Sequence, residues 1–307
     1  MTKSKNIFPL VLKVLLGIMF VVSAILKIVD MDKFEVYIYS YHFFSLNFSF
    51  LVARAAIIAE LVLGIGLISL CFHKLMWWGS MAMLAGYTVL LTYAYFIGRT
   101  DSCHCFGDFL PFNPAQSILK NVILMALFAL CYKAKNYRFR GQWPALIGVV
   151  IASTAAIFLV SPPDNYTTSY NPDKYLNDEL FSQMLSEPPV GEYHLKEGKQ
   201  VVCLLSTSCD FCQLAAHKLS LMQQYYGFPA ENITYVFMGS EEGIEEFFKA
   251  SESARYRAVL YLDVVNLLKI NNGNFPTIVL LDNGNIVHEY GLRNMKEEEI
   301  KEFFVQP

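Results

Sequence analysis

Residues 200–212 read Gln200-Val201-Val202-Cys203-Leu204-Leu205-Ser206-Thr207-Ser208-Cys209-Asp210-Phe211-Cys212. The mostly apolar run that ends at Leu205 predicts a buried strand, and the amphipathic segment after Cys212 predicts a helix to about Tyr226. A strand, a turn, a CxxC pair and a helix therefore follow one another. This order places both cysteines at the start of the helix.

Further elements are expected on the C-terminal side of this helix. Strands are predicted at Ile233–Met238, Thr277–Leu281 and Ile286–Tyr290, and helices over most of 241–270 and from about Lys296. The run Asp282-Asn283-Gly284-Asn285 between the last two strands predicts a hairpin turn. Residues 191–307 are therefore expected to form an α/β domain.

The order of these elements resembles the thioredoxin fold over about residues 196–307. The motif Phe275-Pro276-Thr277 adds to the resemblance, because it matches the cis-proline site that this family places beside its CxxC pair. The resemblance implies that Pro276 keeps a metal from closing on the cysteines. It also implies that the backbone around Phe275, Pro276 and Thr277 docks an extended substrate strand; a simple turn proline is the alternative.

The CxxC pair is expected to carry redox chemistry. A cysteine at a helix N-terminus meets the positive end of the helix dipole and free backbone N–H groups, which stabilise its thiolate. Cys209 is therefore the expected attacking thiol, and Cys212 the thiol that resolves the mixed disulfide. Half of a zinc site is the alternative, but no second CxxC or HxxxH follows, and His217 offers one further ligand at best.

The chain departs from the usual thioredoxin pattern near this pair. Thioredoxin usually carries Trp before its CxxC and a buried Asp six residues before the first cysteine, where this chain has Ser208 and Cys203. The usual acid for proton transfer is therefore missing. Cys203, on a predicted core strand, is expected to be an inert small hydrophobe.

The N-terminal half has the composition of a membrane protein. The chain is 54% hydrophobic, and its mean hydropathy is +0.36, more than a soluble core requires. Apolar runs long enough to cross the hydrocarbon core lie at about 7–29, 50–71, 75–97, 117–133 and 143–160. The prediction is a four-helix transmembrane bundle at 1–140, a fifth span at 141–160, a Pro- and Asn-rich extended linker at 161–190, and the thioredoxin-like domain at 191–307.

Positive charges predict how the chain is oriented in the membrane. Lys and Arg in short loops favour the cytoplasmic side, and Lys3, Lys5, Lys74, Arg138 and Arg140 share one side if the N-terminus is cytoplasmic. The thioredoxin-like domain then lies on the periplasmic side of a bacterial inner membrane, where disulfides persist.

The charge of the chain argues against nucleic acid as a partner. The net charge is -3, and no Lys or Arg run is interleaved with aromatic residues, so nucleic acid is not expected. The expected partners are the lipid bilayer and the thiols and disulfides of envelope proteins.

Three motifs of the membrane half resemble a known family over about residues 7–133. They are Ser23-Ala24-Ile25-Leu26-Lys27-Ile28-Val29-Asp30, Glu60-Leu61-Val62-Leu63-Gly64 and Cys103-His104-Cys105-Phe106-Gly107. Together they are similar to the DoxX-like membrane family and, within it, the MauE group of methylamine utilisation. The resemblance implies a bundle that takes part in disulfide formation or thiol relay, similar in plan to quinone-linked enzymes.

Quinone is the cofactor that this resemblance implies, although no residue set in the sequence defines a quinone pocket. The aromatic side chains near the outer leaflet are simply explained as an interfacial belt. They are Tyr87, Tyr93, Tyr95 and Phe96.

Cys103 and Cys105 are expected to be a second redox pair. A CxC disulfide closes a small strained ring, and strained disulfides are more oxidising. His104 would favour the thiolate. A structural disulfide or a metal site are the alternatives, but two thiols and one His do not complete a tetrahedral site, and no metal is predicted.

Ionisable residues inside the spans usually pair or face the bundle interior. Structural pairing of Lys27 with Glu60, or of Arg54 with Glu60, is favoured over a proton relay. Lys13 is expected to extend to the interface. Cys71 and Cys131, near the cytoplasmic ends of spans, are expected to be structural.

The leading hypothesis is a membrane-bound thiol–disulfide oxidoreductase in which electrons pass between Cys209/Cys212, Cys103/Cys105 and client proteins, linked to quinone. Oxidation of clients is favoured, because the resemblance links the CxC family to disulfide formation. The second hypothesis is a relay that supplies reducing equivalents to envelope proteins, and it requires Cys71 or Cys131 to be reachable from the cytoplasm. The third is a non-enzymatic chaperone or metal-handling module.

Overall fold

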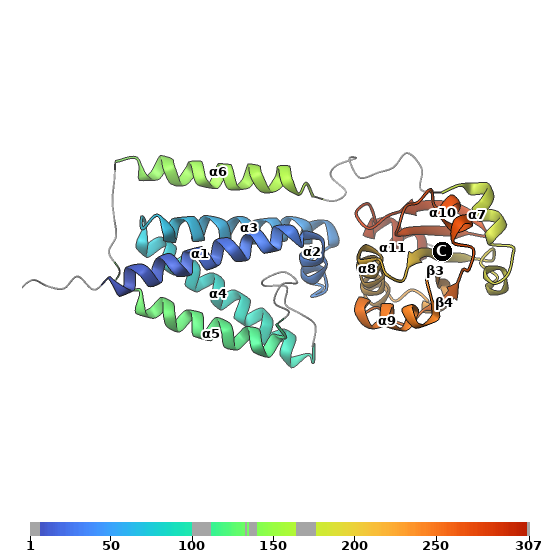
Figure 1. Cartoon of the computed structure of the whole chain (residues 1–307), viewed down its shortest axis with the longest axis horizontal. Coiled ribbons are helices and arrows are strands. Elements are labelled where there is room, and N and C mark those ends of the chain that lie inside the picture. Colours follow the sequence, from blue (N-terminus) through green and yellow to red (C-terminus); the bar gives the residue numbers. More distant parts are fainter. Residues whose placement is uncertain (1–6, 100–111, 133, 135–139, 164–175, 306–307) are drawn as a thin grey trace, which may run out of the picture. The chain divides into compact units, whose positions relative to one another are not determined.

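The computed structural model describes residues 7–99, 112–132, 134, 140–163 and 176–305. The contacts within the chain divide it into two units. The first comprises residues 1–41 and 48–163, and the second comprises residues 42–47 and 164–307. The first unit is helical and the second contains a sheet with helices around it (Figure 1).

The helical unit is built from long apolar helices that run alongside one another (Figure 1). They are α1 (Phe8–Val29), α3 (Leu46–Ile68), α4 (His73–Phe96), α5 (Pro114–Leu130) and α6 (Gln142–Val160), with a short α2 (Met31–Tyr39) after α1. Among the described residues, α1, α3, α4 and α6 are long and apolar enough to span a membrane. The fourth predicted span, at about 117–133, corresponds to α5, a shorter apolar helix of 17 residues.

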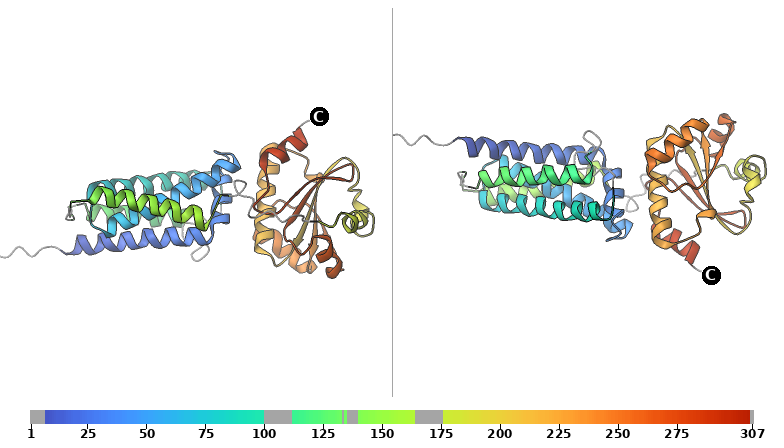
Figure 2. Two further views of the ribbon diagram at one scale, coloured as in Figure 1. Left: turned by 90° about the horizontal axis from the view of Figure 1, so that it is seen from above. Right: turned by 90° about the horizontal axis from the view of Figure 1, so that it is seen from below.

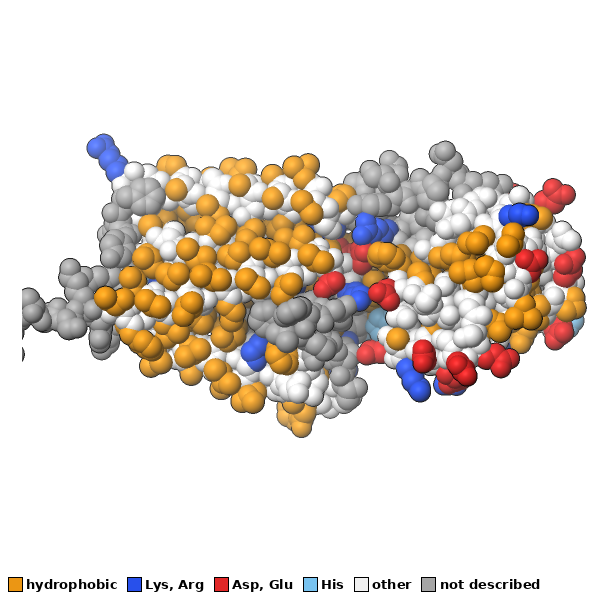
Figure 3. Space-filling view, viewed as in Figure 1, with side chains coloured by type: hydrophobic (Ala, Val, Ile, Leu, Met, Phe, Trp, Pro, Cys, Tyr) orange, Lys and Arg blue, Asp and Glu red, His pale blue; other side chains and the backbone are white. Residues whose placement is uncertain are grey.

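The outward surface of these helices is suited to lipid. Hydrophobic side chains cover the face of the helical unit seen in Figure 3, and charged side chains on that face are few. On α6, for example, Ile151 is 63% exposed and Leu159 is 82% exposed. In lipid such side chains are in a favourable solvent, so this surface is consistent with the predicted spans.

Two glycines allow α1 and α3 to approach closely. A Cβ atom on Gly17 would lie 2.9 Å from the backbone oxygen of Gly64, and a Cβ on Gly64 would lie 2.9 Å from that of Gly17. Helices in lipid have no hydrophobic driving force for association. Small residues at a crossing let the two backbones pack closely, so that van der Waals contacts hold the helices together. The sequence element around Gly64 therefore positions α3 and its Glu60 against α1.

Arg54 joins three helical segments in the interior of this unit, where it is 1% exposed. Its guanidinium forms an ion pair with Glu35 of α2. It also donates 2.9 Å hydrogen bonds to the carbonyl oxygens of Ser161 and Pro162, just after α6. The predicted Arg54–Glu60 alternative is therefore wrong, because α2 brings Glu35 to Arg54 instead.

The second unit contains a five-stranded sheet in the order β4-β3-β2-β5-β6. Its strands are β2 (Lys199–Ser206), β3 (Ile233–Met238), β4 (Arg257–Leu260), β5 (Thr277–Asp282) and β6 (Asn285–Tyr290). Strands β2, β3 and β4 are parallel, whereas β5 and β6 are antiparallel to their neighbours. With a CxxC helix after β2 and a cis-proline before β5, this is the thioredoxin-like topology that the sequence predicted.

Helices cover both faces of this sheet, and the alternation of side chains along β2 assigns the faces. Val202 and Leu204 point into a core with α7 (Asp178–Met184) and α10 (Val264–Ile270). On the other side lie α8 (Asp210–Tyr226), α9 (Glu241–Ser251) and α11 (Glu297–Val305). Figure 2 shows the sheet between the gold helix α8 and the yellow helix α7.

The predicted linker 161–190 is too long. Residues 176–190 belong to the packed domain, since Leu176, Phe181 and Val190 are at most 1% exposed in the core beside the sheet. The Pro and Asn content suggested an extended chain, yet the side chain of Asn177 caps α7 by accepting from the backbone N–H of Leu180. The short strand β4 was likewise missed inside the segment 241–270, which was expected to be mainly helical.

Candidate functional site

The first candidate site is the dithiol at the start of α8. Cys209 is the N-cap residue of this helix, and its sulfur accepts a 3.2 Å hydrogen bond from the backbone N–H of Cys212. Cys209 is half-buried, whereas Cys212 is fully buried. The strand–turn–CxxC–helix order therefore places an accessible sulfur at the helix end and a protected one a turn behind it.

The two thiols differ in acidity. The pKa of Cys209 is lowered to about 7, chiefly by a hydrogen bond from the Cys212 thiol and further by the backbone N–H groups of Cys212 and Phe211. Burial and the Asp210 carboxylate act in the opposite direction and raise this pKa. Burial and the hydrogen bond to Cys209 raise the pKa of Cys212 well above its ordinary value. At neutral pH about half of Cys209 is therefore thiolate, which is the reactive form of cysteine, whereas Cys212 stays protonated.

The predicted docking residues lie at the same end of the sheet. Thr277 pairs in register with Leu204 of β2, and Cys209 follows three residues after the end of that strand. The Phe275–Pro276 peptide bond is cis, as the thioredoxin resemblance implies. Thr277 is buried and its hydroxyl donates a 2.7 Å hydrogen bond to the Asn274 carbonyl, while Phe275 packs against the core.

Cys203 is separate from this reactive pair. It is 1% exposed on β2, between Tyr235 of β3 and Ile278 of β5 in the sheet register. Burial raises the pKa of its thiol far above neutral pH. Cys203 is therefore protonated and enclosed, in agreement with the expected inert core residue.

We predict that alkylation of the reduced protein at Cys209 follows a titration with a midpoint near pH 7. An unperturbed thiol titrates at about 8.5. Because the folded pKa is lowered, the reduced fold gains stability that is fully present above about pH 8.5 and is lost as the pH falls through 7. Iodoacetamide labelling, quantified by mass spectrometry of the Cys209 peptide, measures the midpoint.

Asp210 provides a test of the electrostatics. Asp210→Asn removes a carboxylate that opposes the thiolate, so the midpoint should move to lower pH. Glu302→Gln, an exposed change of equal charge on α11, should leave it near 7. A midpoint near 8.5 in the unmodified protein, or an equal shift in both variants, would contradict this account.

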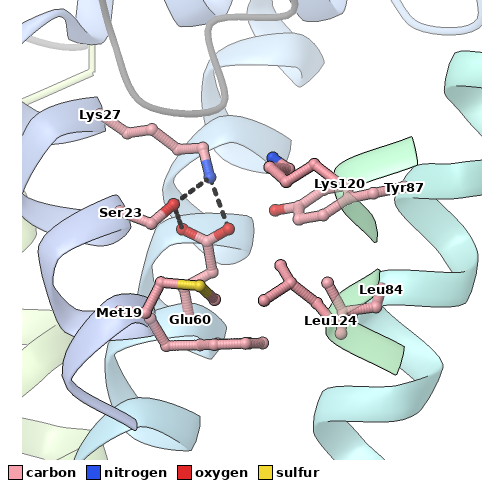
Figure 4. Close-up of a pocket in the computed structure, with 9 residues that line it drawn as sticks. Met19, Ser23, Lys27, Glu60, Leu84, Tyr87, Lys120 and Leu124 are labelled. Atoms are coloured by element: carbon pink, nitrogen blue, oxygen red, sulfur yellow. Dashed lines mark hydrogen bonds and ion pairs between the residues drawn. The ribbon is translucent and has the colours of Figure 1, made fainter. Parts of the chain in front are cut away.

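The second candidate site is a small cavity in the helical unit, of about 30 Å³ (Figure 4). Lys27 of α1 donates a 2.5 Å hydrogen bond to Glu60 of α3 and a 3.1 Å hydrogen bond to Ser23. Ser23 in turn donates to the second Glu60 oxygen at 3.3 Å. The favoured Lys27–Glu60 pairing is therefore present, with both residues at most 4% exposed.

Side chains from α4 and α5 complete the wall of this cavity. Tyr87 and Lys120 point toward the ion pair (Figure 4), and the Lys27 ammonium lies 5.3 Å from the centre of the Tyr87 ring. The interfacial role expected for Tyr87 is therefore wrong. The feature of the sequence that could have placed Tyr87 inside the bundle is its spacing of three residues from Leu84. This spacing puts Tyr87 on the same face of α4 as the buried Leu84 side chain.

The second predicted cysteine pair lies outside the described residues. Cys103, His104 and Cys105 all fall in the segment 100–111. Within the described ranges, no group of three or more His, Cys, Asp or Glu side chains is arranged to hold a metal ion. The described chemistry of the second unit therefore rests on the Cys209–Cys212 dithiol.

Fold and site together define a class: a membrane protein that carries a thioredoxin-like dithiol domain. Residues 5–134 match the family model of the methylamine utilisation protein MauE, which confirms the resemblance of the membrane half to the MauE group. Protein TlpB of Flavobacterium psychrophilum is 25% identical over 347 aligned positions, which cover 94% of this chain and 93% of that protein. The similarity thus extends over both units.

Solved structures with some likeness include two bacterial proteins. One is a secreted Mycobacterium tuberculosis disulfide oxidoreductase homologous to E. coli DsbE, 15% identical, covering 37% of this chain and 85% of that one, with a TM-score of 0.29. The other is StoA from Bacillus subtilis, 21% identical, covering 35% and 83%, with a TM-score of 0.26. At these scores the thioredoxin-like assignment rests on the strand order of the chain itself.

Proposed function

We propose that this protein is a membrane-bound thiol–disulfide oxidoreductase that oxidises client proteins of the cell envelope. The observation that carries the proposal is the asymmetric dithiol, in which Cys209 is accessible with a pKa of about 7 and Cys212 is fully buried. The N-terminus is cytoplasmic and the thioredoxin-like domain is periplasmic in this proposal, as the distribution of Lys and Arg in the loops favours.

The exchange proceeds by two displacements. A client thiolate attacks the Cys209–Cys212 disulfide at Cys209, forms a mixed disulfide and releases Cys212 as a thiolate that takes up a proton. A second client thiolate then attacks the mixed disulfide, which leaves the client with a disulfide and releases Cys209 as a thiolate. Two electrons pass from the client to the dithiol, and the low pKa of Cys209 makes it a good leaving group.

The Cys103–Cys105 disulfide is the proposed oxidant of the reduced dithiol. The Cys209 thiolate attacks one sulfur of that disulfide, and Cys212 resolves the resulting bond, so that the two electrons move to the CxC pair. A strained CxC disulfide is suited to this step because strain makes it more oxidising. Cycling between the two pairs would let one chain serve many clients.

Quinone remains the proposed electron acceptor of the membrane unit on the basis of the resemblance. Lys27, Tyr87 and Lys120 are donors of the type that bind carbonyl oxygens, but the cavity that they line is small, at about 30 Å³, and no described contact is specific to a quinone. The cavity is therefore not assigned to quinone, and no electron-transfer step is placed there.

Trapping of mixed disulfides tests the internal relay. In Cys212→Ala the resolving thiol is absent, so a bond between Cys209 and its partner should accumulate. With the CxC pair intact and oxidised, the Cys209 thiolate of this variant should attack the CxC disulfide, form a bond to Cys103 or Cys105 and release the other CxC cysteine as a thiolate, and mass spectrometry of peptides from isolated membranes maps the bond. Adding Cys209→Ser should remove every such bond.

Two results would count against the relay. Trapped client proteins with no internal bond would indicate a tethered thioredoxin-like enzyme that is recycled by another partner. An internal bond that also forms in the Cys209→Ser control would show that the CxC cysteines cross-link without the proposed nucleophile.

A further inference from the structure

Exposed apolar side chains gather near the reactive dithiol. Within the described residues 176–305, seven large hydrophobic side chains are exposed. Four of these follow the end of β2 or β4 by at most five residues: Phe211, Leu262, Val264 and Val265. Leu262 is 82% exposed, Val265 is 63% exposed, and Phe211, between the two cysteines, is 55% exposed. Scattered exposed apolar residues are ordinary, whereas a group of them marks an interaction surface.

The register of the sheet brings the ends of β2, β3 and β4 to the same edge, because the three strands are parallel. Ser206 of β2 pairs with Met238 of β3, and the register of β3 with β4 places Tyr261 beside Met238. Thr207 and Leu262 each follow by one residue, so two strand spacings, or about 10 Å, separate them. An extended peptide covers this distance with about three residues.

The first turn of α9 lies at the same edge. This helix begins at Glu241, directly after β3, and a Cβ atom on Gly243 would lie 2.9 Å from Oγ1 of Thr207. The turn therefore packs on the segment that leads from β2 to Cys209, two residues after Thr207. Glu241 and Glu242 of this turn are exposed.

Negative charge accompanies the apolar side chains. The segments 207–216, 239–246 and 261–266 contain six Asp or Glu residues and no Lys or Arg. Four of the six are exposed at the starts of helices and take part in no ion pair within the described part of the chain: Asp210, Glu241, Glu242 and Asp263. Carboxylates stabilise helix N-termini, but that role leaves their charge open to a partner.

This surface is separate from the backbone around Pro276. In the strand order β4-β3-β2-β5-β6, β3 and β4 lie on one side of β2, and β5, which follows Pro276, lies on the other. Arg293 and Lys296, in the loop after β6, also lie on the Pro276 side. Cys209, which follows β2, is therefore between the cis-proline segment and the acidic, apolar surface.

We propose that this second surface binds clients, and that its occupant is a polypeptide segment with apolar and basic residues beside its reacting cysteine. The β3–β4 surface, as we call it, consists of three apolar side chains and three carboxylates: Phe211, Leu262, Val265, Glu241, Glu242 and Asp263. The inference rests on the thiol–disulfide exchange proposed for Cys209 and names the class of client.

The two kinds of side chain have different roles in this binding. The apolar side chains are covered by apolar residues of the client, which slows dissociation. The carboxylates attract Lys and Arg of the client, and charge complementarity of this kind acts mainly on the association rate and on the choice of partner.

Matched peptides test the preference for basic clients. The oxidised full-length protein in detergent micelles is mixed with short reduced peptides that share a pair of cysteines and the same apolar residues, flanked by Lys in one peptide and by Glu in the other. Each rate of peptide oxidation is divided by the rate of the same peptide with hydroxyethyl disulfide, which removes the difference in thiol acidity. The Lys peptide should react about tenfold faster at low salt, and the difference should disappear at about 1 M salt.

Charge variants locate this preference. Glu241→Gln combined with Glu242→Gln should lower the ratio of the two rates to about threefold or less. Glu231→Gln combined with Glu302→Gln changes the charge of the domain equally at exposed positions away from this edge, and it should leave the ratio near tenfold.

Apolar variants test the other half of the surface. Leu262→Ser combined with Val265→Ser should slow oxidation of both peptides by about tenfold, because apolar area is no longer covered on binding. Val287→Ser, at an exposed apolar position on β6, should leave both rates unchanged. All of the substituted residues are exposed, and reduction of the Cys209–Cys212 disulfide by dithiothreitol at the unmodified rate verifies that each variant is folded.

The outcomes separate this inference from the function on which it rests. Equal rates for the two peptides, an unchanged ratio in the Glu241/Glu242 variant, or unchanged rates in the Leu262/Val265 variant would overturn the β3–β4 surface and leave exchange at Cys209 standing. A disulfide that reacts with neither the peptides nor dithiothreitol would instead contradict the proposed exchange itself.

Discussion

Replacing Cys209 with serine will abolish disulfide exchange by the thioredoxin-like domain. The hydroxyl of serine is not ionised near neutral pH, whereas the Cys209 thiol has a pKa of about 7 and supplies both the nucleophile and the leaving group. Loss of a nucleophile typically reduces turnover by on the order of a thousandfold or more. Reduction of a fluorescent disulfide-linked peptide by the dithiothreitol-treated protein, compared with the unmodified chain, measures the loss.

Cys203→Ala is the matched control for this prediction. It also removes one sulfur from the same domain, but Cys203 is 1% exposed, and its raised pKa keeps it protonated. We expect Cys203→Ala to exchange at close to the unmodified rate, with a modest loss of stability from the small cavity. Equal losses in the two variants would show that the loss of exchange is not specific to Cys209, which would contradict its role as the nucleophile.

The site in the thioredoxin-like domain was largely predictable because its determinants are local. A buried strand followed within three residues by CxxC and an amphipathic helix leaves little choice for where Cys209 lies, and the structure places it at the helix N-cap. The pKa of Cys209 was predictable only in direction. Its value depends on the Cys212 hydrogen bond and on Asp210, which are features of the folded site.

The features that the sequence missed depend on tertiary contacts. Strand β4 has four residues and no alternation of its own, and it is defined by its register with Thr234–Phe237 of β3. The partner of Arg54 is Glu35, on a helix too short to be recognised by periodicity. Lys13 resembled an interfacial lysine because its burial follows from the packing of the surrounding helices.

The largest stability effect is expected at Lys27 and Glu60. Lys27→Met leaves an unpaired buried carboxylate and Glu60→Gln leaves an unpaired buried ammonium, and breaking one side of such a pair costs about 3–5 kcal/mol. The double variant leaves no unpaired charge, so most of the stability should return. Denaturation in detergent micelles, followed by loss of helical signal, measures the three variants, with the exposed Lys74→Met as the charge control.

The double variant also separates a structural pair from a proton relay. Lys27 and Ser23 both donate to Glu60, so both oxygens of its carboxylate are engaged by partners that fix α1 against α3. We therefore expect the folded double variant to retain disulfide exchange with membrane electron acceptors. A different result would indicate a proton relay: the double variant is stable and its Cys209 dithiol still reacts with soluble disulfides, but turnover through the membrane unit is lost. In that case the Lys27–Glu60 pair moves protons, and the cavity beside Tyr87 and Lys120 is part of the proton path.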